Sequence, residues 1–151
     1  MDAATVQEQY ETLVGQLNQA MLVTKHDRVP LLRQIMAHLG QPDRYFHVIH
    51  LAGTNGKGST GAMLASVLQA QGLKVGRFSS PAINDDREQL QLNGHWISPA
   101  EFIDSYHEIL PVLGNMGLQA ADISIFEWEF LIGMVWFRNQ NVAWAVVEAG
   151  L

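Results

Sequence analysis

The sequence predicts an α/β fold: a mostly parallel, doubly wound sheet with a phosphate-binding loop after its first main strand. Two observations predict it. Residues 45–79 have the pattern of strand, glycine-rich loop, helix and strand, which is a βαβ unit with a right-handed crossover. Residues 142–148 (VAWAVVE) are apolar on both faces of a strand, as expected for a central parallel strand.

Two helices are expected before the first strand. In the first helix, apolar residues recur at helical spacing: Val6, Tyr10, Leu13, Val14 and Leu17. The second is predicted over residues 30–39, because Pro30 suits a first helical turn and Gly40 suits the position after a last one. Residues 45–51 (YFHVIHL) are rich in aromatic and β-branched side chains and predict the strand, which we expect to be buried.

The elements after the loop follow the same reasoning. A helix that packs on the sheet should end at Gly72, and residues 73–79 (LKVGRFS) should form the next strand. Alternating residues on either side of Asn93-Gly94 then predict a small hairpin insertion over residues 89–97, since this dipeptide favours a type I′ turn.

Two capping boxes predict the last two helices. Ser98-Pro99-Ala100-Glu101 combines an N-cap serine, a proline at the first helical position and a carboxylate three residues after the serine. Ser124 and Glu127 repeat this spacing before an apolar helix over residues 125–138, which should be buried between layers. We therefore interpret Glu127 as a helix cap and not as a catalyst, and the four tryptophans mainly as core residues.

Composition excludes several classes of protein. The 151 residues are 48% hydrophobic with a formal net charge of −6, which argues against a disordered chain and against binding to nucleic acid or a membrane surface. The absence of cysteine excludes disulfides and thiolate metal sites. No apolar run approaches the roughly 20 residues of a membrane span, and the N-terminus is unlike a signal peptide. We expect a cytoplasmic, monomeric protein.

The phosphate-binding loop is the segment with the clearest chemistry. It comprises Gly53, Thr54, Asn55, Gly56, Lys57, Gly58, Ser59 and Thr60. The glycines let the backbone approach phosphate oxygens, the helix N-terminus offers unpaired N–H groups, and Lys57 adds a positive charge. We expect it to bind the phosphates of a nucleotide, namely ATP. The usual hydroxyl ligand for Mg²⁺ directly after the lysine is replaced by Gly58, so a Mg²⁺ site requires residues from elsewhere.

The loop and its flanking motifs closely resemble the folylpolyglutamate synthases and dihydrofolate synthases, in the Mur ligase superfamily. The segments that carry the resemblance are residues 39–42 (LGQP), 47–59 (HVIHLAGTNGKGS), 79–81 (SSP), 126–127 (FE) and 146–151 (VVEAGL). Together they span most of the chain in the family's order. Other Mur-type ligases, which act on carboxylates such as cell-wall precursors, usually follow the loop lysine with Thr or Ser, so Gly58-Ser59 favours the folate branch.

The resemblance implies an ATP- and Mg²⁺-dependent ligase that joins L-glutamate to a folate or to dihydropteroate through an acyl phosphate. It implies that Lys57 is the catalytic contact to the ATP phosphates and that Ser80 and Glu148 hold Mg²⁺. It also implies a folate-binding loop containing Pro81, Arg87 and Glu88; here Arg87-Glu88-Gln89-Leu90 replaces the family's Asn-Glu-Arg-hydrophobic run, so only the glutamate clearly matches.

The resemblance also bears on domain organisation. Residues 1–151 correspond to part of the family's N-terminal ATP-binding domain, incomplete at its C-terminus, and the C-terminal glutamate-ligase domain is absent from this chain. We therefore expect this chain alone to be inactive. Three other hypotheses stay open: another Mur-type amino-acid ligase, a P-loop nucleotide-binding protein without ligase activity, and a fragment without activity. The sequence does not distinguish dihydrofolate synthase from folylpolyglutamate synthase or from a bifunctional enzyme.

Overall fold

A computed structural model describes residues 3–19, 28–52, 57–79 and 84–148. These residues form two compact units. The first comprises the described residues within 1–41 and 98–132, and the second comprises those within 42–97 and 133–151. The boundary between them falls inside one long helix, α5 (Ile125–Asn139), whose first half belongs to the first unit.

The second unit is built on a five-stranded mixed sheet with the order β1-β5-β2-β3-β4. Its three main strands are parallel: β1 (His47–Leu51), β5 (Trp144–Glu148) and β2 (Val75–Ser79). The hairpin strands β3 (Leu90–Leu92) and β4 (His95–Trp96) add to β2 in antiparallel orientation. The central position of β5 and the hairpin insertion are both confirmed.

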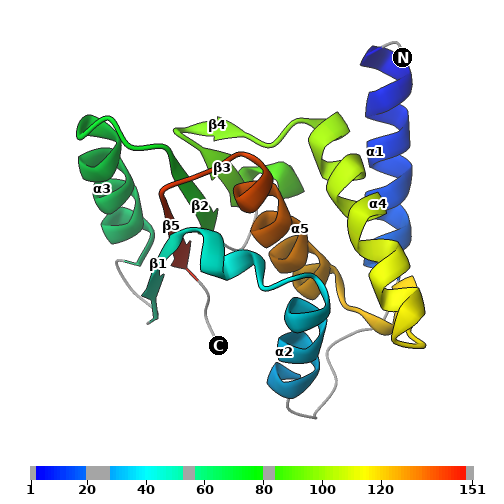
Figure 1. Cartoon of the computed structure of the whole chain (residues 1–151). Helices are drawn as coiled ribbons and strands as arrows, with labels where there is room; N and C mark the ends of the chain where they lie inside the picture. The colour runs from blue at the N-terminus through cyan, green and yellow to red at the C-terminus, as the bar shows by residue number, and fades with distance from the viewer. Residues whose placement is uncertain (1–2, 20–27, 53–56, 80–83, 149–151) are drawn as a thin grey trace. The chain divides into compact units, whose positions relative to one another are not determined.

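Helices cover both faces of the parallel strands, which confirms the doubly wound arrangement (Figure 1). On one face lies α3 (Lys57–Ala70), where a Cβ at Gly61 would overlap the carboxyl group of Glu148 on β5. On the other face lies the second half of α5, where a Cβ at Gly76 of β2 would sit 2.6 Å from the ring of Phe137. Glycine at both positions allows helix and strand to pack closely.

Local backbone chemistry fixes the turns of this unit. Asn93 and Gly94 have φ values of 48° and 83°, the positive pair that a type I′ hairpin turn needs. Gly72 ends α3 with a φ of 81°. Two short 3₁₀ helices, η1 (Pro42–Tyr45) and η2 (Asp86–Gln89), precede β1 and β3 respectively.

The prediction of a buried first strand is wrong for β1. This strand begins at His47, two residues later than expected, and its side chains are exposed or half-buried. The reason is its position at the edge of the sheet, where only β5 pairs with it. Phe46, just before the strand, is the residue that is buried, and its ring meets Phe137 edge-on at 5.9 Å.

The first unit is helical and contains α1 (Ala3–Asn18), α2 (Val29–His38), α4 (Pro99–Asn115), the 3₁₀ helix η3 (Ala120–Asp122) and the first half of α5. Its core is apolar, and the rings of Tyr10 and Phe102 meet edge-on at 5.1 Å between α1 and α4. The capping box of Ser98 with Glu101 begins α4 as predicted.

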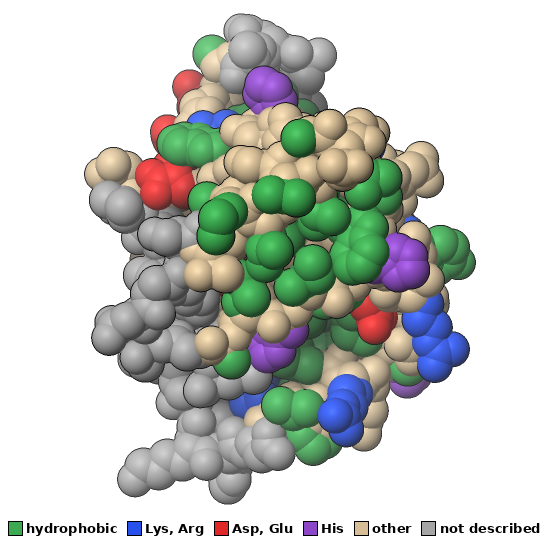
Figure 2. Space-filling model, turned by 90° about the vertical axis from the view of Figure 1, so that its left-hand side faces the viewer, with side chains coloured by type: hydrophobic (Ala, Val, Ile, Leu, Met, Phe, Trp, Pro, Cys, Tyr) green, Lys and Arg blue, Asp and Glu red, His purple; other side chains and the backbone are tan. Residues whose placement is uncertain are grey.

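The outer face of α3 is unusually apolar. Met63 and Val67 are 63% and 55% exposed, although both are large hydrophobic side chains. Figure 2 views the molecule from the side on which α3 lies in Figure 1, and hydrophobic side chains gather on that side.

Candidate active site at the ends of the parallel strands

The predicted nucleotide and metal residues follow three neighbouring strand ends. In the parallel register, Leu51 of β1 and Ser79 of β2 both pair with Glu148, which lies between them on β5. The three strands therefore end in one row. Their last residues therefore share the edge at which open α/β sheets bind ligands. Residues 53–56, which come shortly after β1 in the chain, and Ser80, which follows β2, lie outside the described residues.

The helix that follows the loop begins at Lys57 and runs for 14 residues. Because α3 follows the end of β1 and its Gly61 lies against Glu148, the N-terminus of α3 is at the edge where the strands end. A helix N-terminus offers unpaired N–H groups and the positive end of the helix dipole, which anions prefer. Thr60 is exposed in its first turn. Residues 53–56 and the side chains of residues 57–59 lie outside the described residues, so their predicted roles stay predictions.

Glu148 is the predicted site residue whose surroundings are best described. Glu148 is only 1% exposed. Gly61 of α3 makes room for its carboxylate, because a Cβ added at Gly61 would lie 2.6 and 2.7 Å from the two carboxylate oxygens. A buried carboxylate requires a cation or hydrogen-bond donors, because burial without them is costly. Arg77 supplies both, donating from Nε to Glu148 Oε2 at 2.5 Å and from Nη2 to Oε1 at 3.3 Å.

This donor set fits a Mg²⁺ site in its chemistry, since a carboxylate at a strand end offers the oxygen ligands that Mg²⁺ prefers. A cation at Glu148 would compete with Arg77, because both oxygens of Glu148 already accept hydrogen bonds from Arg77. The second expected ligand, Ser80, lies outside the described residues. Within the described ranges, no three His, Cys, Asp or Glu side chains cluster as around a metal.

The expected folate-binding loop has local structure of its own. Glu88 accepts from the backbone N–H groups of Asn84 and Asp85, which caps η2. Arg87 donates to the carboxylate of Asp85 at 3.0 Å and lies over the half-exposed ring of Trp96, 5.7 Å from its centroid. Pro81 lies outside the described residues. These contacts hold the loop in shape, while the role in folate binding stays a prediction.

Glu127 is a helix cap, as the sequence indicated. It accepts from the backbone N–H of Ser124 at 2.9 Å, and its own N–H donates to the Ser124 hydroxyl. Arg28 donates to both carboxylate oxygens, at 2.9 and 3.1 Å. Burial raises the pKa of Glu127, but the hydrogen bonds and charge of Arg28, with those of Ser124, outweigh burial and leave the pKa below its ordinary value.

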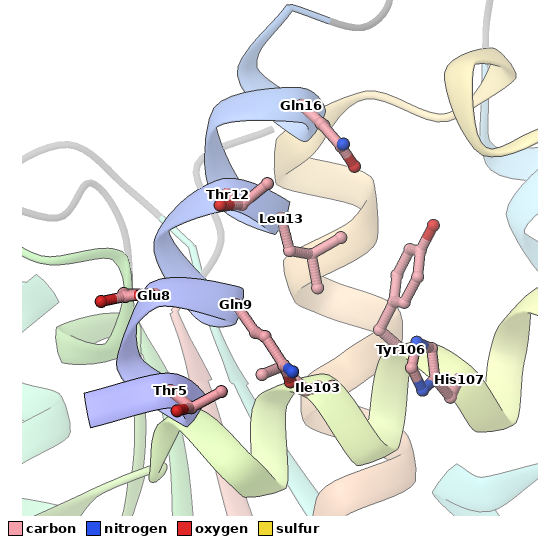
Figure 3. Close-up of a pocket in the computed structure, with 9 residues that line it drawn as sticks. All are labelled: Thr5, Glu8, Gln9, Thr12, Leu13, Gln16, Ile103, Tyr106 and His107. Carbon is pink, nitrogen blue, oxygen red and sulfur yellow. The ribbon is translucent and has the colours of Figure 1, made fainter. Parts of the chain in front are cut away.

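A separate hollow of about 490 Å³ lies in the helical unit between α1 and α4 (Figure 3). It is lined mainly by uncharged polar groups, among them Gln9, Thr12 and Gln16 of α1 and Tyr106 and His107 of α4. Burial raises the pKa of Tyr106. The described residues around this hollow include no Lys or Arg, so it lacks the cations that phosphate binding uses.

The sequence and the fold were compared with known proteins. The chain is 36% identical to the folylpolyglutamate synthase of Lacticaseibacillus casei over 115 residues, which is 75% of this chain and 27% of that enzyme. The chain belongs to the folylpolyglutamate synthase and dihydrofolate synthase family. No model of a protein family matches the chain.

Solved structures of family members have the same fold. The folylpolyglutamate synthase of Thermotoga maritima superposes with a TM-score of 0.84 at 28% identity, over 96% of this chain and 34% of that protein. A complex of a folylpolyglutamate synthase with AMPPCP and folate also gives a TM-score of 0.84, at 29% identity, over 94% of this chain and 35% of that protein. The chain thus spans about a quarter to a third of the length of these relatives.

Two ion pairs, one at the strand ends and one in the helical unit, were not predicted from the sequence. The pairs Arg77–Glu148 and Arg28–Glu127 join residues 71 and 99 positions apart. A signal for the first pair exists: Arg77 is the one charged residue in the strand segment 75–79 (VGRFS), so a buried acidic partner could have been expected. No comparable signal marks Arg28.

None of the described helices is long and apolar enough to span a bilayer.

Proposed function

We propose that this chain forms the ATP-binding part of a ligase that joins L-glutamate to a folate or to dihydropteroate. The observation that carries the proposal is the row of three parallel strand ends, which juxtaposes the start of α3 with a buried carboxylate, Glu148, in a chain of this family. The bound AMPPCP and folate of the similar complex support a nucleotide and a folate as the substrate classes.

The chemistry requires two steps. The γ-phosphoryl group of ATP passes to a carboxylate oxygen of the acceptor, which forms an acyl phosphate and releases ADP. The glutamate amine then attacks the acyl carbon and phosphate leaves. Lys57 and the N–H groups of residues 55–59 would hold the ATP phosphates, and the dipole of α3 would favour the negative charge there.

Ser80 and Glu148 would hold the Mg²⁺ that accompanies the nucleotide. When bound, the ion supplies charge neutralisation to the transferring phosphoryl group. Glu148 provides the anionic ligand at a fixed position, because the close approach of α3 at Gly61 leaves its carboxylate little room. Pro81, Arg87 and Glu88 would contribute to the acceptor site. We place this ligase in the cytoplasm as a monomer, acting on small molecules and not on nucleic acid.

The decisive experiment measures ADP release from Mg·ATP, with and without L-glutamate, across reduced folates and dihydropteroate. It is carried out on this chain and on the product of its complete reading frame. The chain alone should be inactive, whereas the complete product should release ADP only when glutamate and one acceptor are both present. The preferred acceptor would distinguish dihydrofolate synthase from folylpolyglutamate synthase.

A matched pair of variants tests the role of the loop lysine. Lys57→Met should lower turnover of the complete product by about 10²–10³-fold, as expected for the loss of one charge-stabilising group. Lys74→Met makes the same chemical change just before β2, at the opposite end of that strand from Ser79, and should leave turnover unchanged. ADP release that is indifferent to glutamate and acceptor would favour a P-loop nucleotide-binding protein without ligase activity. ADP release that requires another amino acid and another carboxylate in place of glutamate and a folate would favour a different Mur-type ligase.

A further inference from the structure

Arg77 occupies an unusual position in the sheet. It stands in the middle of β2 and forms the ion pair with Glu148, and its side chain is 20% exposed while that of Glu148 is 1% exposed. The two residues lie on the same face of the sheet, beneath α3, since Arg77 aligns with Val146 and Glu148 follows two residues later. The guanidinium is therefore directed along the strands toward the row of strand ends.

A small polar pocket of about 150 Å³ lies beside Arg77, between α3 and the hairpin. Arg77 itself lines this pocket together with Ser66 and Gln69 of α3 and Gln91 of β3. Their hydroxyl and amide groups could accept hydrogen bonds from a guanidinium. Arg77 thus pairs with Glu148 and lies next to a polar space into which its long side chain could turn.

We propose that Arg77 is the counter-ion that neutralises Glu148 in the absence of metal and that it is displaced toward this pocket when Glu148 binds a divalent cation. This inference rests on the proposed metal role of Glu148. Arg77 is in this sense a positioning residue: it fixes the carboxylate in a buried place and lowers the affinity of the site for metal without nucleotide.

The physical reason is competition for the same two oxygens. Both oxygens of Glu148 accept from Arg77, so a cation must share them or replace the arginine. A positive guanidinium a few ångströms away also repels an incoming cation. Nucleotide phosphates at the start of α3 would offset that repulsion. The site should therefore bind metal weakly alone and more strongly together with a nucleotide.

The test measures Mn²⁺ binding to the chain by electron paramagnetic resonance, with and without ADP, for four proteins: the parent chain, Arg77→Met, Arg77→Lys and Glu148→Gln. Arg77→Met removes the charge at similar length and should tighten Mn²⁺ binding about tenfold or more without ADP, because an unpaired buried carboxylate attracts a cation strongly. Arg77→Lys keeps the charge but loses the two-point contact, and should tighten binding by a smaller factor.

Thermal unfolding with and without Mg²⁺ keeps the proposal testable if Arg77→Met folds poorly. Loss of one partner of a buried pair destabilises a protein, and a cation that replaces the lost partner should restore stability. Mg²⁺ should therefore raise the melting temperature of Arg77→Met more than that of the parent chain. Equal increases in both proteins would count against displacement of Arg77.

The outcomes separate this inference from the function on which it rests. If Glu148→Gln binds Mn²⁺ as the parent chain does, Glu148 is not a metal ligand and the proposed metal site is wrong. If Glu148→Gln weakens Mn²⁺ binding but Arg77→Met leaves it equal or weaker, the metal site stands and the competition by Arg77 is refuted. If Glu148→Gln binds Mn²⁺ more weakly and Arg77→Met binds it more tightly than the parent chain, both the metal site at Glu148 and the competition by Arg77 are supported.

Discussion

Replacing Gly61 by alanine should reveal how firmly Glu148 is held beneath α3. Alanine is favoured over glycine inside a helix by about 1 kcal/mol, so without other effects the change would stabilise α3. At Gly61, however, the new methyl group would lie within 2.7 Å of both carboxylate oxygens of Glu148. The carboxylate is buried and held by two hydrogen bonds from Arg77, so it has little freedom to move away.

Gly15 of α1 provides the matched control, because nothing lies within 4 Å of a Cβ added there. Gly15→Ala should therefore stabilise the chain by about 1 kcal/mol. Overpacking a tight contact costs about 1–3 kcal/mol, so Gly61→Ala should be less stable than Gly15→Ala by that amount. At about 2–4 °C per kcal/mol for a chain of this size, the two melting temperatures should differ by several degrees.

The assay is thermal unfolding followed by far-ultraviolet circular dichroism, repeated in the Glu148→Gln background. The neutral amide is no smaller than the carboxylate, so the steric penalty of Gly61→Ala should persist there. Equal stabilisation by Gly61→Ala and Gly15→Ala in the parent chain would refute the reasoning, since it would mean that Glu148 yields to a methyl group without cost.

Three further predictions concern stability elsewhere. The lowered pKa of Glu127 beside Arg28 contributes stability that is present above the unfolded-state pKa of about 4.3 and is lost as the pH falls through the folded-state pKa. The free energy of unfolding, measured in urea as a function of pH, should therefore fall more steeply in acid for the parent chain than for Glu127→Gln. Gly94→Ala places a side chain at a φ of 83° and should cost about 1–2 kcal/mol in a urea titration, and an unchanged midpoint would argue against the type I′ turn. Gly76→Ala should cost about 1–3 kcal/mol, measured by thermal unfolding, because its Cβ would press on the fully buried ring of Phe137; a neutral result would show that the ring can shift.

The relation between local sequence and structure is closest where one short segment contains all the information. The Asn93-Gly94 turn, the capping boxes at Ser98 and Ser124, and the glycine end of α3 each depend on residues a few positions apart. The central place of β5 was also predictable, because a strand apolar on both faces must be covered on both faces. Family motifs extended the expectations to nucleotide and metal residues; of these, Glu148 is buried at the end of β5, and its role as a metal ligand stays a prediction.

The sequence by itself determined the order of the main elements and their turns and caps, and it predicts a phosphate-binding loop at the start of α3. Only the tertiary structure decided which strand lies at the edge, why Gly61 must be glycine, and that Arg77 neutralises Glu148. The physical reason is the range of the interactions. Caps and turns are closed by hydrogen bonds between near neighbours, whereas burial of β1 and the pairing of Arg77 with Glu148 depend on which distant segments pack together.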